Sequence, residues 1–283
     1  MSEQKWNIEI KPKTSLFELN LQEVFRYKDL LVLFIKRDVT TLYKQTILGP
    51  LWYIIQPLFT TLVFNIVFFN IAGIKPGLVP PFLFYLSGTC LWTYFSDSFI
   101  NTSRSFTDNS GIFGKVYFPR LVLPFSKVIS GMLKFLIQFV LFLVFYIYYF
   151  FFTESQLHLN FNLLFVPVII FLMMILALGL GLIVSSLTTK YRDLQHLLTF
   201  GIQLLMYATP VIYPMQKVAD KWYGHLLWYN PLSSFMELFR FAFFGEYGVS
   251  ILHLTYSVFV CLLIFLIGLI MFNKHEKTFM DTV

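Results

Sequence analysis

Six stretches of this chain contain no Asp, Glu, Lys or Arg, and each is long enough to cross a lipid bilayer. A spanning helix needs about 20 mainly apolar residues. Because backbone groups in lipid must hydrogen-bond to one another, runs of this kind are expected to be helical. The uncharged stretches are 45–74, 76–96, 135–153, 155–189, 194–216 and 247–273.

The composition indicates one integral membrane domain. Hydrophobic residues make up 57% of the 283 residues and charged residues 13%, about half the charged share of a soluble domain. We predict an all-α integral membrane protein with six transmembrane helices in a domain at 50–273, between a cytoplasmic arm at 1–49 and a cytoplasmic tail at 274–283. The expected spans are about 50–71, 82–102, 127–150, 163–187, 195–214 and 251–272.

Basic residues are concentrated in the N-terminal arm. Segment 1–44 carries eight of them, whereas the short loop before the second span carries Lys75 alone. The positive-inside rule therefore predicts a cytoplasmic N-terminus, and six spans return the C-terminus to the cytoplasm. One predicted outer segment fits less well, since it carries Lys217, Lys221 and Arg240.

Residues 15–44 are expected to form an amphipathic helix before the first span. Ser15 with Glu18, and Asn20 with Glu23, each match the capping box that begins a helix. A helix with one apolar and one basic face lies at the membrane surface. The alternative is an ordinary anchor that only sets the topology of the chain.

Segment 222–247 is unusually aromatic for a loop and unusually polar for a span. The pair Asn230-Pro231 interrupts it. Two short re-entrant helices on the outer side of the membrane fit both properties, because irregular backbone at membrane depth is tolerated where protein buries it.

Motifs of several enzyme classes are absent. Gly114-Lys115 is followed by Val116, so the chain has no phosphate-binding loop for ATP. There is no H-E-x-x-H motif, and Cys90 and Cys261 lie in apolar runs without the spacing of metal ligands. We therefore expect no catalytic residues, no metal site and no cofactor in this chain.

Charges inside the predicted spans are the main candidates for function, because a charge in the membrane is costly. Arg120, Lys127 and Lys134 recur every seven residues, so they share one face of a helix unless Pro124 breaks its register. Such a basic stripe would suit a lipid that carries phosphate. The alternatives are lysines that snorkel to the interface, or a lysine that pairs with Asp97.

Aromatic residues make up 20% of the chain. Many suit the interfacial belts of a membrane protein, but others lie deep in the predicted spans. An aromatic face can stack on a sugar ring, so lining of a pore and simple packing both remain open for these residues. The deep aromatic residues are Phe59, Phe64, Phe68, Trp92, Tyr94 and Tyr207.

Several motifs, in order along the chain, resemble the membrane subunits of polysaccharide-exporting ABC transporters. The resemblance covers nearly the whole chain. The matching runs are Arg37-Asp38, Tyr43 to Trp52, Gln56-Pro57, Lys115 to Leu121, Leu123-Pro124, Tyr191 to Leu194, Thr209 to Tyr213, and Tyr229 to Pro231.

The resemblance implies a homodimer in the bacterial inner membrane, with two copies of a separate ABC ATPase subunit that carries the ATP and magnesium. The substrate it implies is a polysaccharide on a polyprenyl diphosphate lipid, such as O-antigen, capsule or a teichoic-acid-like polymer. Our hypothesis is that Arg120, Lys127 or Lys134 receives the lipid diphosphate near the cytoplasmic side. Aromatics of spans one, two and five, Trp52 included, would line the sugar path. The implied segment that couples to the ATPase is Asn109, Ser110, Gly111, Ile112, Phe113, Gly114, Lys115, Val116 and Tyr117. The implied outer gate contains Trp228, Tyr229, Asn230, Pro231 and Phe235.

Two other functions remain alternatives. One is an ABC exporter of drugs or small lipids, which needs the same topology. The other is a membrane enzyme that modifies lipid-linked glycans, although the chain lacks the paired carboxylates and metal ligands that such chemistry uses. Membrane lipids are expected partners, and nucleic acid is not.

Overall fold

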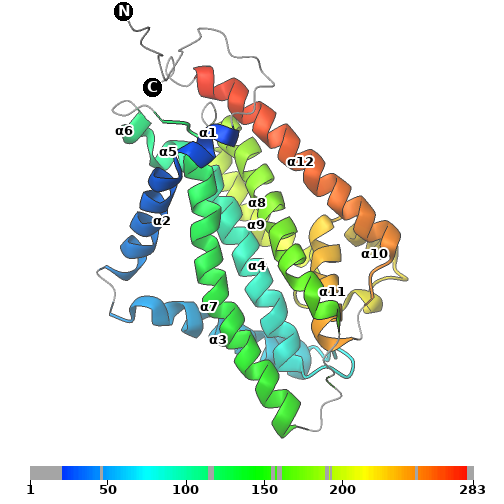
Figure 1. Cartoon of the computed structure of the whole chain (residues 1–283). Coiled ribbons are helices and arrows are strands. Elements are labelled where there is room, and N and C mark those ends of the chain that lie inside the picture. The colour runs from blue at the N-terminus through cyan, green and yellow to red at the C-terminus, as the bar shows by residue number, and fades with distance from the viewer. Residues whose placement is uncertain are drawn as a thin grey trace, which may run out of the picture.

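The computed structural model of the chain describes residues 21–44, 47–113, 118–153, 157, 161–188, 191, 193–245 and 248–278, and every regular element in these ranges is helical (Figure 1). The N-terminal part contains α1 (Leu21–Arg26), α2 (Lys28–Tyr43), the 3₁₀ turn η1 (Gly49–Leu51), α3 (Trp52–Phe64) and the π-helix η2 (Asn65–Ile71). The central part contains α4 (Pro81–Ser103), α5 (Ser105–Asp108), α6 (Ser110–Phe113), α7 (Val122–Phe152), η3 (Phe161–Phe165) and α8 (Val166–Thr188). The C-terminal part contains α9 (Leu194–Tyr207), η4 (Met215–Lys217), α10 (Trp222–Trp228), α11 (Pro231–Phe244) and α12 (Ile251–Thr278).

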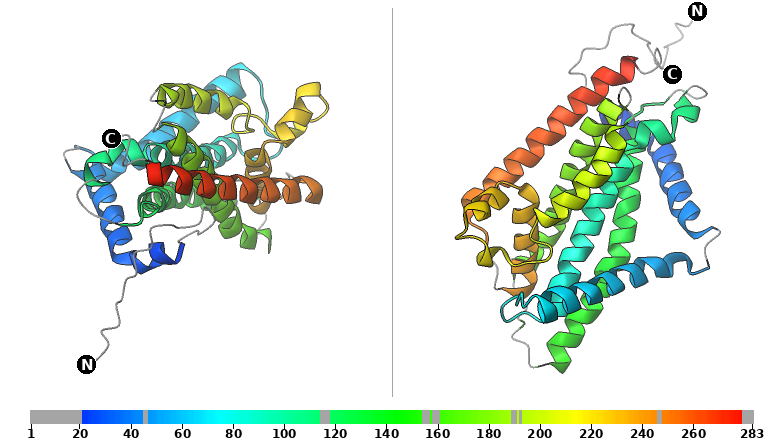
Figure 2. Two further views of the ribbon diagram at one scale, coloured as in Figure 1. Left: turned by 90° about the horizontal axis from the view of Figure 1, so that it is seen from above. Right: turned by 180° about the vertical axis from the view of Figure 1, so that it is seen from behind.

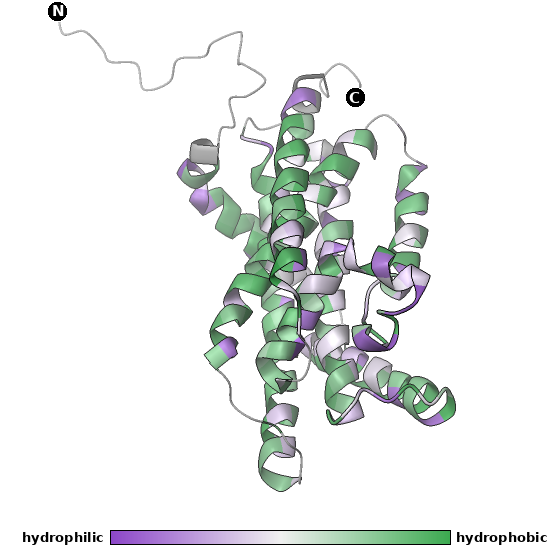
Figure 3. Ribbon diagram, turned by 90° about the vertical axis from the view of Figure 1, so that its right-hand side faces the viewer, coloured by the Kyte–Doolittle hydropathy of each residue, from purple (hydrophilic) through white to green (hydrophobic). Residues whose placement is uncertain are grey.

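Four helical segments of the described ranges are long and apolar enough to cross a membrane: Gly49–Ile71, Val122–Phe152, Phe161–Thr188 and Ile251–Lys274. Hydrophobic residues predominate along the long helices, and hydrophilic residues gather mainly near helix ends and in connections (Figure 3). The chain is therefore a multi-pass helical membrane protein.

Helix α4 lies at the centre of the bundle, and most of its residues are buried. Its sequence is less apolar than that of the four segments above, because it packs against protein and contains several Ser and Thr residues. Their hydroxyls donate to carbonyls of the same helix: Ser87 Oγ to Phe84 O at 2.8 Å, and Thr89 Oγ1 to Tyr85 O at 2.7 Å. These bonds let a helix with polar side chains be buried.

Small residues bring α8 close to its two neighbours. A Cβ atom added to Gly181 would lie 2.5 Å from Thr102 on α4. One added to Gly268 on α12 would lie 2.5 Å from the carbonyl oxygen of Gly179 on α8. Gly179, Gly181 and Gly268 therefore allow the close approach of α8 to α4 and α12, as small residues commonly do between membrane helices.

Helix α9 ends at Tyr207, whereas the uncharged stretch predicts a span to 214. Pro210 has no N–H to continue the helical ladder. The backbone there is irregular up to η4, and the carbonyls of Pro210 and Val211 accept hydrogen bonds from Arg240 of α11. Protein side chains thus satisfy the backbone that the helix leaves unpaired.

The first two long helices of the chain run in different directions (Figures 1 and 2). Helix α2 lies beside α7 and steeply inclined, and α3 crosses α4 and α7 at a large angle. The segment expected as the first span, about 50–71, is long and apolar enough to cross a membrane, but this chain covers little of it. An interfacial position for residues 15–44 stays a prediction, and 15–20 lie outside the described ranges.

Candidate functional site

Helices α2, α3, α4, α5 and α7 surround a polar cavity of about 420 Å³. Acids and bases are present on its wall in equal number, so their formal charges cancel. A polar cavity between apolar helices is where a membrane protein can accept a charged ligand. The charged residues on its wall are Arg37, Asp38, Asp97, Asp108, Lys127 and Lys134.

Lys134 of α7 forms an ion pair with Asp97 of α4. Its ammonium also lies 5.2 Å from the ring centroid of Tyr53 on α3, an attractive arrangement for a cation and an aromatic ring. The pair confirms the alternative in which one of the lysines is paired with Asp97. About a fifth of the Lys134 side chain remains exposed, 21%, so the ion pair leaves it open to the cavity.

Lys127 forms the second ion pair, with Asp38 of α2, at 2.9 Å. The guanidinium of Arg37 donates to the other carboxylate oxygen of Asp38 at 3.0 Å and to the side-chain oxygen of Asn109 at 3.2 Å. Asn109 is itself held by a bond to the carbonyl of Ser105. These contacts connect α7 to α2 and α2 to the end of α5. Neither contact of Arg37 and Asp38 is predictable from sequence, because Asn109 and Lys127 lie far along the chain and meet α2 only in the folded protein.

Arg120 does not join the two lysines on the cavity wall. Helix α7 begins at Val122, so Arg120 lies in the preceding turn. Pro124 lies in the first helical turn, where its missing N–H disturbs no helical bond. Lys127 and Lys134 therefore keep the shared face that their spacing predicts, and Arg120 departs from it.

The segment expected to couple to an ATPase begins at Asn109, which is buried. Gly111 is exposed and Ile112 is half-buried on the short helix α6, which also includes Ser110 and Phe113. Helices α5 and α6 lie at the same end of the bundle as α1 and the end of α12 (Figure 1). The remaining residues of that segment, Gly114, Lys115, Val116 and Tyr117, lie outside the described residues.

The expected pore aromatics fall into two groups. Trp52, Phe59 and Tyr207 are 50%, 66% and 63% exposed, and Phe64 and Phe68 on α3 and η2 are half-buried. In contrast, Trp92 and Tyr94 lie inside the bundle at 7% and 2% exposure. Trp92 packs against Phe95, and Tyr94 against Phe135. In this conformation the two therefore pack against protein, because α4 is surrounded by other helices.

The aromatic segment expected at an outer gate forms two short helices, α10 and α11, with the break at Tyr229 and Asn230. Trp228 stacks on His253 at 4.9 Å, and Tyr229 meets Tyr256 edge-on at 5.7 Å. Both contacts tie the break to α12. Pro231 is the first residue of α11, and Phe235 is fully buried.

Asn230 holds the start of α11 in place. Its side-chain oxygen accepts from the N–H of Leu232 at 3.1 Å, which caps the helix. Its amide nitrogen donates to the carbonyl of Ala208 at 2.9 Å and to Thr209 Oγ1 at 3.0 Å. The same side chain thus begins α11 and fixes the irregular backbone after α9.

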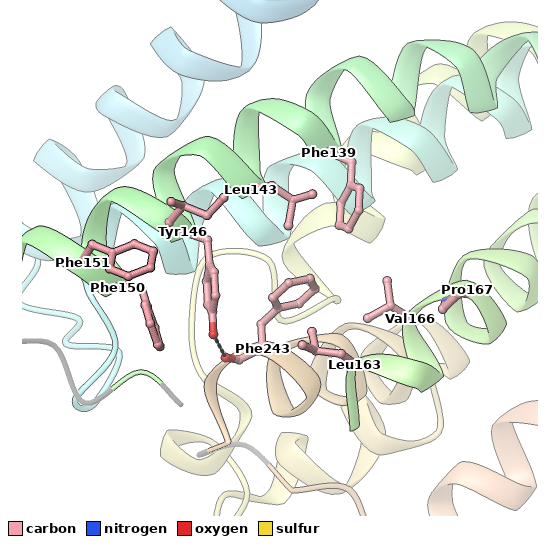
Figure 4. A pocket seen from close by; sticks show the side chains of 10 residues that line it. Phe139, Leu143, Tyr146, Phe150, Phe151, Leu163, Val166, Pro167 and Phe243 are labelled. Atoms are coloured by element: carbon pink, nitrogen blue, oxygen red, sulfur yellow. Dashed lines mark hydrogen bonds between the residues drawn. The ribbon is translucent and has the colours of Figure 1, made fainter. Parts of the chain in front are cut away.

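An apolar pocket of about 460 Å³ lies between α7, the start of α8 and α11 (Figure 4). The hydroxyl of Tyr146 points to Phe243 and donates to its carbonyl at 3.0 Å. The remaining side chains on its wall are hydrocarbon, among them Phe139, Leu163 and Val166. The pocket therefore suits a hydrocarbon chain and not a sugar.

Comparison with known proteins identifies relatives over most of the chain. An O-antigen export system permease protein of Klebsiella pneumoniae is 29% identical over 259 residues, which cover 89% of this chain and 94% of that protein. One from Myxococcus xanthus is 28% identical over 226 residues, or 79% of this chain and 84% of that protein. The sequence pattern of the ABC-2 type transporter family matches residues 29–244. The chain therefore belongs to the ABC-2 type transporter family.

Proposed function

We propose that this protein is the membrane permease subunit of an ATP-driven exporter of lipid-linked polysaccharide. The observation that carries the proposal is the likeness, over nearly the full length of both chains, to proteins named O-antigen export permeases. The bundle of apolar helices supports a transport subunit. The polymer would be O-antigen, capsule or a teichoic-acid-like chain.

The membrane arrangement that we propose has six spans, with both termini in the cytoplasm of a bacterium and the domain in its inner membrane. Helix α4 would be the second span, and α9 with the irregular residues after it the fifth. Helices α10 and α11 would re-enter the outer side as the gate. The placement of α1, α5, α6 and the end of α12 at one end of the bundle supports a common cytoplasmic side (Figure 1).

The working assembly in this proposal contains two copies of the chain and two ATPase subunits, which bind ATP and magnesium. The long uncovered face of α3 supports a second copy or a substrate path beside it. The segment from Asn109 to Tyr117 would insert into the ATPase. Trp52, Phe59, Phe64, Phe68 and Tyr207 would stack on sugars as the polymer passes.

The lipid diphosphate would enter the polar cavity and meet Lys127 and Lys134. The two ammonium groups stand on one face of α7 and are partly exposed to the cavity. Lysine is a flexible point charge that suits a phosphate group. Arg120 would act earlier, at the cytoplasmic end, because it precedes the helix.

The test is to deplete the protein from its host cells and locate the lipid-linked polysaccharide. Export predicts polymer accumulating in the cytoplasm and disappearing from the surface, and restoration by a plasmid copy of the gene. Unchanged surface polysaccharide would contradict the substrate assignment. ATPase activity stimulated by a hydrophobic drug would then favour export of small molecules.

A further inference from the structure

We propose that Asp38 couples the binding of an anionic head group in the polar cavity to the segment that is expected to contact the ATPase. The head group would bind Lys127 in place of Asp38 and break the ion pair between α2 and α7. The contacts of α2 with Asn109, the first residue of that segment, and with Phe118, the residue after it, would then change. This inference rests on the proposed function and adds a regulatory route to it.

The cavity holds cations that are already neutralised by carboxylates from different helices. Lys127 pairs with Asp38 of α2, and Lys134 pairs with Asp97 of α4. The Lys127 side chain is 18% exposed and the Asp38 side chain 13%. A diphosphate offers more negative charge and more acceptor oxygens than one carboxylate, so it can compete for the ammonium. Its entry must therefore separate a lysine from its acid.

Of the two acids, Asp38 is the one whose separation from its lysine would change the contacts between α2 and α7. One carboxylate oxygen accepts from Arg37 on the same helix, and the other lies 2.9 Å from Lys127 on α7. When Lys127 leaves, Asp38 keeps only its local partner, and the ion pair between α2 and α7 is gone. A partly buried carboxylate without its cation raises the free energy of this arrangement. A shift of α2 that exposes Asp38 to water would lower it.

Helix α2 touches the first residue of the expected coupling segment and the residue that follows the segment. Arg37 donates to Asn109, its first residue. Phe34, one turn earlier, packs on Phe118, the residue that follows the segment, with ring centroids 5.7 Å apart. The Arg37 guanidinium also lies 4.8 Å from the centroid of the Phe34 ring, so the two contacts share one turn of helix. A displacement of α2 therefore changes its contacts with Asn109 and with Phe118, the residue after the segment, together.

The second ion pair lacks this connection. Asp97 and Lys134 join α4 to α7, and Lys134 faces Tyr53. Neither residue has a described bond to α2 or to Asn109. The route from the cavity to the coupling segment thus runs through Lys127, Asp38, Arg37 and Asn109.

The experiment measures ATP hydrolysis by the complete transporter, permease with its ATPase, in lipid vesicles with and without a long-chain polyprenyl diphosphate. The expected wild-type result is a low basal rate that the probe raises. Asp38→Asn should raise the basal rate severalfold toward the stimulated rate and leave little further response. Asp29→Asn removes the same charge from an exposed position of the same helix and should behave like the wild type.

Arg37→Gln supplies a second variant in case Asp38→Asn does not assemble. It leaves Lys127 and Asp38 paired but breaks the bond to Asn109, so it too should raise the basal rate and lose the response. Basal and stimulated rates of Asp38→Asn and Arg37→Gln that equal those of Asp29→Asn would overturn the proposal, as would a wild-type rate that the probe does not change. The location of polysaccharide in depleted cells tests the export function separately, so the two failures are distinguishable.

Discussion

The guanidinium of Arg240 lies 3.7 Å from the ring centroid of Phe84, which joins α11 to α4 deep inside the protein. Arg240 also pairs with Glu237 at 3.1 Å and donates to the carbonyls of Pro210 and Val211. Its side chain is about 1% exposed. Arg240 of α11 therefore connects α4 with the irregular backbone that follows α9.

Replacing Arg240 by Met should destabilise the protein by about 3–5 kcal/mol, because Glu237 and two carbonyls lose a buried partner. Unfolding of the purified protein in detergent measures the loss. Arg240→Met combined with Glu237→Gln should recover part of the stability, since no buried charge is then left unpaired. Equal stability of the wild type and the single variant would show that the Arg240 contacts do not hold α11 in place.

Asn230→Ala should destabilise the protein by about 0.5–2 kcal/mol through loss of the helix cap alone. The total loss of stability should exceed the loss from the cap, because the Asn230 amide also donates hydrogen bonds to Ala208 and Thr209. Asn230→Asp keeps the oxygen that caps Leu232 but has no amide donor, so it should fall between wild type and Asn230→Ala. Thermal unfolding of the three proteins gives the order, and a different order would contradict the double role.

Gly268→Ala should destabilise the protein by about 1–3 kcal/mol, the usual effect of overpacking. The added methyl group would lie 2.5 Å from the carbonyl oxygen of Gly179, and backbone cannot yield as a side chain does. Gly201→Ala on α9 is the control, since nothing lies within 4 Å of its added Cβ. A similar unfolding temperature for both variants would exclude close packing of α8 on α12.

The sequence predicts the long helices well, because an uncharged run of sufficient length has few alternatives in lipid. Helix α4 at Pro81–Ser103 lies within two residues of the predicted segment 82–102. Pro210 is a local reason for α9 to end before 214, but the partner of the carbonyls left unpaired there was not predictable, since Arg240 lies about 30 residues further along the chain. A local pattern contains no information on such a partner.

The residues of the polar cavity could also be predicted only in part from the sequence. The seven-residue spacing of Lys127 and Lys134 correctly places them on one helix face, but it does not identify their acids. Asp38 comes from the arm and Asp97 from α4, so the pairs depend on how three helices pack. The burial of Trp92 and Tyr94 also depends on which helices surround α4, and uncharged composition does not reveal that.

Trp52 and Trp92 should respond differently to replacement by Ala. Trp92→Ala should destabilise the protein by about 3–5 kcal/mol, because it empties a packed site beside Phe95. Trp52 is half exposed, so Trp52→Ala should leave the unfolding temperature nearly unchanged and reduce export of polysaccharide. Normal export by Trp52→Ala would remove it from the sugar path.

Replacing Lys127 and Lys134 together by Gln should reduce export about tenfold or more, because a charge-assisted hydrogen bond contributes about 1.5–3 kcal/mol. Assembly with the ATPase, measured by co-purification, should be retained. Since each change also leaves an acid without its cation, the control adds Asp38→Asn and Asp97→Asn to the same protein. The reference is the variant with the two acid changes alone, because Asp38→Asn is itself expected to alter coupling. If the ammonium groups bind the lipid, export by the fourfold variant stays below that of this reference. If the lysines serve only to neutralise the two acids, the two proteins export equally, and a diphosphate site at these residues is excluded.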